Sequence, residues 1–319
     1  MKKHQDLYDQ ITDKIIKQLE AGVIPWLRPW DKKEAAHISG QLAMMPMNRV
    51  SARAYSGINA ILLWCEAYER GWEQPLEFVT YRQAEELGGH VRKGEEATMI
   101  VFLGEAPKKD WQPPADDPTS TKGKWYKFLK KYWVFHWSQC EGVKPREQRP
   151  RNTVAMTEPG FNAFVASTGA NIKVGGTRAC YVPSLDFVAM PPLGSFVDAG
   201  NYKSVLCHEL CHWTGHVKRL ARDLTGGFGS HKYAREELIA EIGSAFLCAQ
   251  LGIEGKLRHA EYLGSWIKTL QEDSKAVVQA AAGASRAADY LLATMAQPIA
   301  RNRALVPIQP EQHALAMAA

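Results

Sequence analysis

Apolar residues recur with a helical period in several segments of the first half of the chain. Residues 6–21 carry them at four-residue steps and are predicted to form an amphipathic helix, and residues 58–70 repeat the pattern. Residues 80–87 predict a shorter helix that begins with a capping threonine. Residues 98–103 and 132–137 are rich in β-branched and aromatic side chains, which indicates two strands.

The second half alternates short strands with longer helices. Residues 158–167 predict a helix, and the three segments that follow predict strands at 172–174, 179–182 and 187–190. Further helices are expected at 202–213 and 233–251, followed by a helical region at 256–296. Helices and strands are thus mixed without the regular alternation of a parallel sheet, which predicts an α+β fold.

Length and composition indicate two globular domains. The chain has 319 residues, 45% of them hydrophobic, and eight of its ten tryptophans precede residue 150. A proline-rich, charged stretch near that point predicts the boundary. We expect a first domain at 1–145 with a flexible insertion at 104–124, a linker at 146–153, a second domain at 154–296 and a tail at 297–319.

Several classes of protein are disfavoured by the same sequence. The longest strongly apolar run, residues 242–253, is too short to span a bilayer, and the first ten residues lack the apolar core of a secretory signal. The six cysteines form no CxxC pair, so we expect reduced thiols, a cytoplasmic location and no membrane partner. The net charge of +5 is too small to indicate a nucleic-acid partner by itself.

The most specific motif is HExxH, formed by His208, Glu209 and His212 inside a predicted helix. Histidines four residues apart share one helix face, so both imidazoles can bind one metal ion. The glutamate that follows the first histidine is placed to act as general base on a water at that metal. We therefore predict a zinc site, one ion per chain, with another divalent metal as an alternative, and Glu209 as the catalytic residue.

A third protein ligand is expected on the next helix. Glu237 and Glu241 lie four residues apart among apolar residues, and buried carboxylates require a cation. Glu237 is predicted to bind the metal and Glu241 to orient a ligand histidine, although these two roles are interchangeable at this level. Glu236 fits a solvated acidic face better. His216 is a weaker alternative ligand, because Gly215 is expected to end the helix before it.

A second signal points to nucleic acid. Residues 122–137 interleave five lysines with seven aromatic residues and contain no acid. Lysines neutralise phosphates and aromatic faces stack with bases, which is typical of sequence-tolerant single-strand binding, although a lysine-protected edge strand gives the same pattern. Other basic and aromatic segments repeat the theme. The candidate DNA-binding residues are Trp26, Trp30, Arg53, Tyr55, Arg82, Lys93, Lys124, Trp125, Lys127, Lys130 and Lys131.

Longer strings resemble the ArdC-type antirestriction proteins of conjugative plasmids. The resemblance covers nearly the whole chain. It rests on DLYDQITDKIIKQLEAG, PWLRPW, YSGINAILLW, VTYRQAEELGGHVRKGE and VFHWSQCEG in the first half, and on HELCHWTGH and YAREELIAEIGSAFL in the second. It implies an N-terminal domain that binds single-stranded DNA and a C-terminal zincin-like metallopeptidase domain. The metal motif of the family falls on His208, Glu209 and His212, and its acidic helix falls on Glu237 and Glu241.

The resemblance also implies a function, namely protection of incoming single-stranded plasmid DNA from host restriction during conjugation. Together with the HExxH motif, this predicts a zinc metallopeptidase whose substrate is a host restriction-system protein or another peptide. Two alternatives stay open. The chain coats the strand without proteolysis and its metal is structural, or it is a protease of DNA-bound proteins that acts only when DNA is present.

Overall fold

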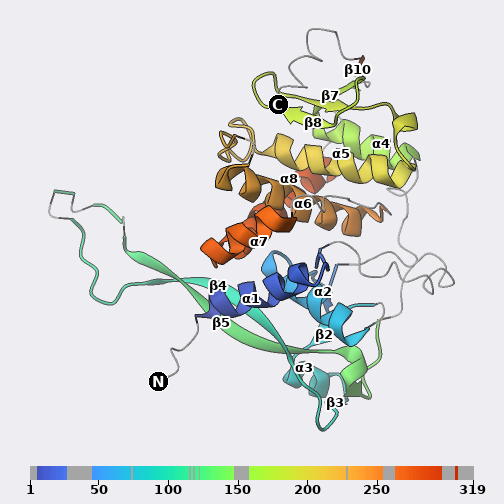
Figure 1. The fold of residues 1–319 in the computed structure, drawn as a ribbon. Helices are drawn as coiled ribbons and strands as arrows, with labels where there is room; N and C mark the ends of the chain where they lie inside the picture. Colours follow the sequence, from blue (N-terminus) through green and yellow to red (C-terminus); the bar gives the residue numbers. More distant parts are fainter. Residues whose placement is uncertain are drawn as a thin grey trace. The chain divides into compact units, whose positions relative to one another are not determined.

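The computed structural model describes residues 6–26, 45–72, 75–146, 158–253, 263–296 and 306–307, apart from residues 115, 118, 122 and 228 within those ranges. The described residues group into two compact units. One unit contains those of 48–53 and 77–145. The other contains those of 1–47, 54–76 and 146–319. Figure 1 traces the elements of both units in chain order.

The smaller unit is built on a four-stranded sheet in which three of the strands pair antiparallel. The strand order is β1-β2-β5-β4, with bounds of Met47–Asn48, Glu77–Val79, Trp125–His136 and Thr98–Pro107. A two-stranded sheet pairs β3 (His90–Val91) with β6 (Cys140–Glu141). The short helix α3 (Tyr81–Glu86) follows β2. Its start is fixed by a capping box between Thr80 and Gln83, as the threonine in the sequence predicts.

The strands β4 and β5 form a long antiparallel ribbon that extends well beyond β2 (Figure 1). Their register runs from Thr98 opposite Val134 to Pro107 opposite Trp125. The expected insertion at 104–124 is therefore too long, because residues 104–107 belong to the ribbon. Gly104 and Pro107 indicated a loop, but pairing with the aromatic residues of β5 extends the strand past Gly104 and as far as Pro107.

The larger unit combines a second sheet with a group of helices. The strand order is β10-β7-β9-β8, with bounds of Val306–Pro307, Asn171–Val174, Phe187–Met190 and Cys180–Val182. The helices are α4 (Glu158–Thr168), α5 (Ala199–Thr214), α6 (His231–Leu251), α7 (Leu263–Glu272) and α8 (Ala276–Ala293). α6 packs against both α5 and α8, which buries most of its circumference.

The helical region expected at 256–296 contains two helices, and residues 254–262 lie outside the described part of the chain. α7 ends at Glu272 and α8 begins at Ala276. Between them, the Asp273 carboxylate accepts a hydrogen bond from the backbone N–H of Lys275 at 2.9 Å. This side chain competes with the helical backbone pattern and allows the chain to turn.

The first two helices pack with the larger unit rather than with the sheet that follows them in sequence. α1 (Leu7–Glu20) contacts α7, and α2 (Ile58–Arg70) contacts α8. The indole of Trp64 lies 5.6 Å from the ring of Phe246. The expected domain boundary at residue 145 placed both helices in the first domain because they come early in the chain. Their apolar surfaces are instead buried in the larger unit. α2 is apolar on most of its surface and requires cover on more than one face.

No helix in the described ranges is long and apolar enough to cross a membrane. All six cysteines are free thiols, in agreement with the expectation from their spacing, and five of them are buried.

Candidate metal centre

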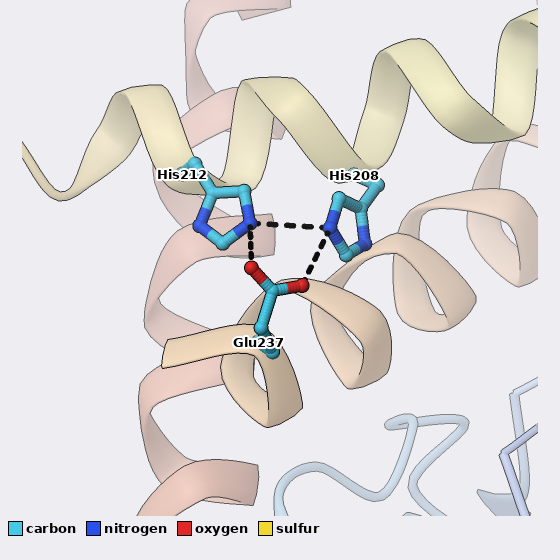
Figure 2. Close-up of side chains that lie close together, drawn as sticks. All are labelled: His208, His212 and Glu237. Carbon is cyan, nitrogen blue, oxygen red and sulfur yellow. Dashed lines mark hydrogen bonds and ion pairs between the residues drawn. The ribbon is translucent and has the colours of Figure 1, made fainter. Parts of the chain in front are cut away.

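The helix α5 presents the HExxH motif in its last two turns. Its start is capped by the Asp198 carboxylate, which accepts a hydrogen bond from the Asn201 N–H at 2.7 Å. His208 and His212 lie one turn apart and face α6, as their spacing predicts (Figure 2). The helix ends at Thr214, so His216 lies beyond it and outside the cluster that the two histidines form.

The helix α6 faces this motif with three buried glutamates. The Ser230 hydroxyl caps its first turn by accepting the Tyr233 N–H at 3.2 Å. Glu237 and Glu241 then follow four residues apart on the face toward α5, and Glu241 has no exposed surface. The segment is a helix because it contains neither glycine nor proline before Gly243, and a left-handed Gly252 ends it.

His208, His212 and Glu237 converge on one point (Figure 2). The two imidazole Nε2 atoms lie 3.1 Å apart. The carboxylate oxygens of Glu237 lie 3.4 Å from Nε2 of His208 and 3.5 Å from Nε2 of His212. In a tetrahedral zinc site with metal–ligand distances of about 2.0–2.1 Å, ligand atoms lie about 3.3–3.4 Å from one another. The three donors therefore fit one zinc ion or a metal of similar size.

The other ring nitrogen of each histidine contacts a different carboxylate. Nδ1 of His208 lies 3.2 Å from Oε2 of Glu241, and Nδ1 of His212 lies 3.1 Å from Oε1 of Glu236. A carboxylate beside Nδ1 favours a hydrogen on that nitrogen and leaves Nε2, which faces Glu237, as the atom of each ring that can bind a metal ion. Glu237 thus lies among the converging donor atoms, and Glu241 lies beside the other ring nitrogen of His208.

Glu236 was expected on a solvated face, and this prediction is wrong. Its carboxylate is buried and forms a two-point pair with the Arg222 guanidinium, at 2.9 Å from Nε and 2.7 Å from Nη2. Arg222 also donates to the Cys211 carbonyl and the Thr214 hydroxyl at the end of α5. The sequence did not predict this pair. Glu236 is next to Glu237 and was expected to point to solvent, and no sequence period places Arg222, in the loop after α5, beside it.

The cluster carries a marked excess of negative charge. Glu209, Glu236, Glu237 and Glu241 surround the two histidines, and Arg222 is the cation paired with Glu236. Burial lowers the pKa of His208, but hydrogen bonds to Glu237 and Glu241 raise it more, so it lies well above its usual value. Burial raises the pKa of Glu237, but the facing histidines hold it down at about 2. This charge distribution favours a divalent cation between the donors.

Glu209 lies beside the cluster on the side of the edge strand β8. It is buried, and its charge acts both on His208 and on Cys180 of β8. Burial and this negative charge raise the pKa of the Cys180 thiol to about 11, so the thiol is protonated at neutral pH. β8 is antiparallel to β9 and has no partner on its other side within the described sheet, and its Cys180 lies within electrostatic reach of Glu209.

The candidate DNA-binding residues lie in different parts of the structure. The prediction for Trp26 is wrong, because its side chain is 3% exposed and its ring centroid lies 5.7 Å from that of Trp266 inside the larger unit. Its neighbouring prolines and arginine suggested a loop, but the indole is part of the core. Trp30 lies outside the described residues, and the side chain of Lys127 does as well. Tyr55 is half-buried in the larger unit.

The remaining candidates belong to the smaller unit. Arg53, Arg82 and Lys93 are exposed, and Arg82 pairs with Glu86 at 3.0 Å. The others lie on the ribbon or at its far end. They are Lys124, Trp125, Lys130 and Lys131. Nζ of Lys124 lies 5.7 Å from the ring of Trp111 and 6.0 Å from that of Trp125, so the far end combines cationic and aromatic groups.

Comparison with known proteins defines the class first. Residues 159–283 match the model of a zincin-like metallopeptidase family, and residues 5–135 match that of the N-terminal domain of the anti-restriction factor ArdC. The chain is thus a two-domain α+β protein with an ArdC-type N-terminal domain and a zincin-like domain. The matched N-terminal range includes α1 and α2, although both helices pack in the larger unit.

Individual relatives agree with this class. The chain is 37% identical to the antirestriction ArdC protein from plasmid R388. The match to the metal-free crystal structure has a TM-score of 0.74 and covers 98% of that chain. The match to the Mn(II)-bound crystal structure has a TM-score of 0.73 and covers 99% of that chain. Each match covers 92% of the present chain. It is 36% identical to the protein y4eC of Sinorhizobium fredii, with 90% and 91% of the two chains covered. The chain belongs to the ArdC antirestriction family.

A further relative is much longer. The chain is 37% identical to the DNA primase TraC of Escherichia coli over 96% of its own length, but it spans only 29% of that protein.

Proposed function

We propose that this protein binds single-stranded DNA and protects incoming plasmid DNA from host restriction, with a zinc-dependent peptidase centre in its zincin-like domain. The observation that carries the proposal is the convergence of His208, His212 and Glu237 beside Glu209, in a chain whose N-terminal part matches the ArdC domain. His208, His212 and Glu237 hold the metal in this account. Glu241 and Glu236 fix the orientation of the two imidazoles.

Zinc bound to these donors would supply a Lewis acid that lowers the pKa of water. Glu209 accepts the proton of the attacking water and returns it to the leaving amine. The outer edge of β8 offers backbone groups to which an extended peptide can pair as an added strand, next to Glu209. The protonated Cys180 thiol on that strand takes no part as a nucleophile.

The DNA-binding half of the proposal rests on the family and on the lysines and aromatic residues of the smaller unit. Stacking and phosphate contacts together favour a single strand, whose bases are accessible, over a duplex. We expect the protein to bind a fluorescent single-stranded oligonucleotide more tightly than the same sequence as a duplex. Affinity should fall as salt rises, with a slope of log K against log[salt] of about −0.7 for each phosphate neutralised.

Fluorescence anisotropy across a salt series measures both properties. Equal affinity for single and double strands, or no dependence on salt, would contradict the DNA-binding half and would leave a peptidase without a DNA role.

A further inference from the structure

The β4–β5 ribbon carries a continuous row of aromatic side chains on one of its two faces. Cross-strand register places Phe102 opposite Lys130, Gly104 opposite Phe128, and Ile100 opposite Tyr132. Because successive residues of a strand alternate between faces, these six residues and Tyr126 share one face. The exposed fractions are 54% for Phe102, 47% for Tyr126 and 42% for Tyr132, which is unusual for rings gathered in one place.

These rings contact one another in series along the ribbon. The ring centroid of Phe128 lies 6.1 Å from that of Tyr126 and 6.5 Å from that of Phe102, and Phe102 lies 6.5 Å from Tyr132. The four rings therefore form one extended apolar surface. We call Phe102, Tyr126, Phe128 and Tyr132 the aromatic row.

Gly104 allows the row to form. A Cβ at this position would lie 2.8 Å from Cε1 of Phe128 and 2.9 Å from Cε1 of Phe102, closer than real contacts permit. The backbone of Gly104 lies in a strand and has none of the positive φ values that favour glycine, so alanine fits the backbone there. The glycine is thus required by the two rings that lie over it and not by the course of the chain.

Charge beside the row matches a polyanion. Nζ of Lys130 lies 5.3 Å from the ring of Tyr132 on the same face. Register places Lys130 on the face of the row and Lys131, opposite Val101, on the other face. The only acid in the sequences of β4 and β5 is Glu105, which register places opposite Lys127 and off the face of the row. Half-exposed rings offer stacking faces to any base, and the Lys130 ammonium beside them neutralises a phosphate.

We propose that the aromatic row is the surface on which consecutive bases of single-stranded DNA stack, and that Gly104 sets the positions of its rings. The inference rests on the proposed function and deepens it, because it assigns the bases to a defined face of one ribbon. None of the four rings is among the candidate DNA-binding residues named from the sequence, although Tyr126, Phe128 and Tyr132 lie within the lysine- and aromatic-rich segment 122–137.

The test is anisotropy of a fluorescein-labelled oligothymidine with the full chain and its variants, at several salt concentrations. Phe102→Ala and Tyr132→Ala each remove one stacking face and should weaken binding by at least about fivefold, with an unchanged salt slope. Gly104→Ala should weaken binding to a similar degree without removing any ring or charge. Lys130→Gln should instead reduce the salt slope by about 0.7.

Leu103→Ala is the matched control, since Leu103 is an exposed apolar residue of the same strand that register places on the opposite face, across from Leu129. It should bind as the wild type does. Circular dichroism and the thermal midpoint of each variant establish that the ribbon still folds.

The inference would be overturned if the row variants bound DNA as tightly as the wild type, or if Leu103→Ala were as impaired as they are. It would also be overturned if light scattering showed that the wild type self-associates and that Phe102→Ala abolishes this self-association. Tighter binding of oligouridine than of oligothymidine would also contradict the assignment to DNA. Absence of single-strand binding by the wild type would instead contradict the proposed function itself.

Discussion

Glu209→Gln is expected to reduce peptide hydrolysis by a factor of about 10² to 10⁴, because glutamine cannot accept the proton of the attacking water. Glu209 is not among the three residues whose donor atoms converge, so the variant should retain its metal and its affinity for DNA. Glutamine has nearly the same shape, and the fold should be unchanged. The rate is measured with labelled casein and with the protein's own chain, with and without single-stranded DNA.

Glu158→Gln is a suitable control, since this exposed glutamate of the same domain lies outside the cluster and forms a long ion pair with Lys203 of α5, at 3.9 Å. Its activity should equal that of the wild type. If Glu209→Gln loses metal, Glu209 is a ligand and the assignment is wrong. If plasmid protection survives in Glu209→Gln, the metal centre serves the structure and the protein acts by coating the strand. Hydrolysis confined to samples that contain DNA would favour a protease of DNA-bound proteins.

Arg222→Ala is expected to destabilise the protein by about 3–5 kcal/mol, because it leaves the buried Glu236 carboxylate without its cation. It should also weaken metal binding by about 10- to 100-fold, since Glu236 orients the ligand His212. Chemical denaturation in the presence of a chelator measures the first effect without a contribution from metal. Competition with a colorimetric zinc indicator measures the second.

Arg235→Ala provides the control for Arg222→Ala. Arg235 is an arginine of α6 that also pairs with an acid, Asp273, but both side chains are substantially exposed. Its loss should change the free energy of unfolding by no more than about 1 kcal/mol. In a Glu236→Ala background, Arg222→Ala should cost much less than it does alone, because the uncompensated charge is gone. Equal costs in both backgrounds would contradict the role assigned to the pair.

The core of the metal centre was predictable because helix geometry fixes it locally. His208 and His212 converge because they lie one turn apart, and the pair of acids Glu237 and Glu241 was predictable from burial on a second helix. Arg222 was not predictable as the partner of Glu236. Its position depends on how the loop after α5 folds back, and Gly215 permits this, since a Cβ there would lie 3.0 Å from Nη2 of Arg222.

The strands and most helices followed from periodicity, whereas their grouping did not. α1 was predicted almost to its ends, but its apolar stripe does not specify which surface covers it. The same applies to Trp26, whose aromatic ring suits DNA stacking and core packing equally well, and which the fold buries against Trp266. Gly104 was misread as a loop residue because the rings that require a glycine there come from across the ribbon.

His208, His212 and Glu237 are proposed to bind one metal ion without help from Glu209. Mass spectrometry of purified protein can measure the metal content of the wild type, Glu237→Ala and Glu209→Gln. We expect about one zinc per chain in the wild type and in Glu209→Gln, and a large loss in Glu237→Ala. Full metal content in Glu237→Ala, or none in the wild type after addition of zinc, would contradict this proposal.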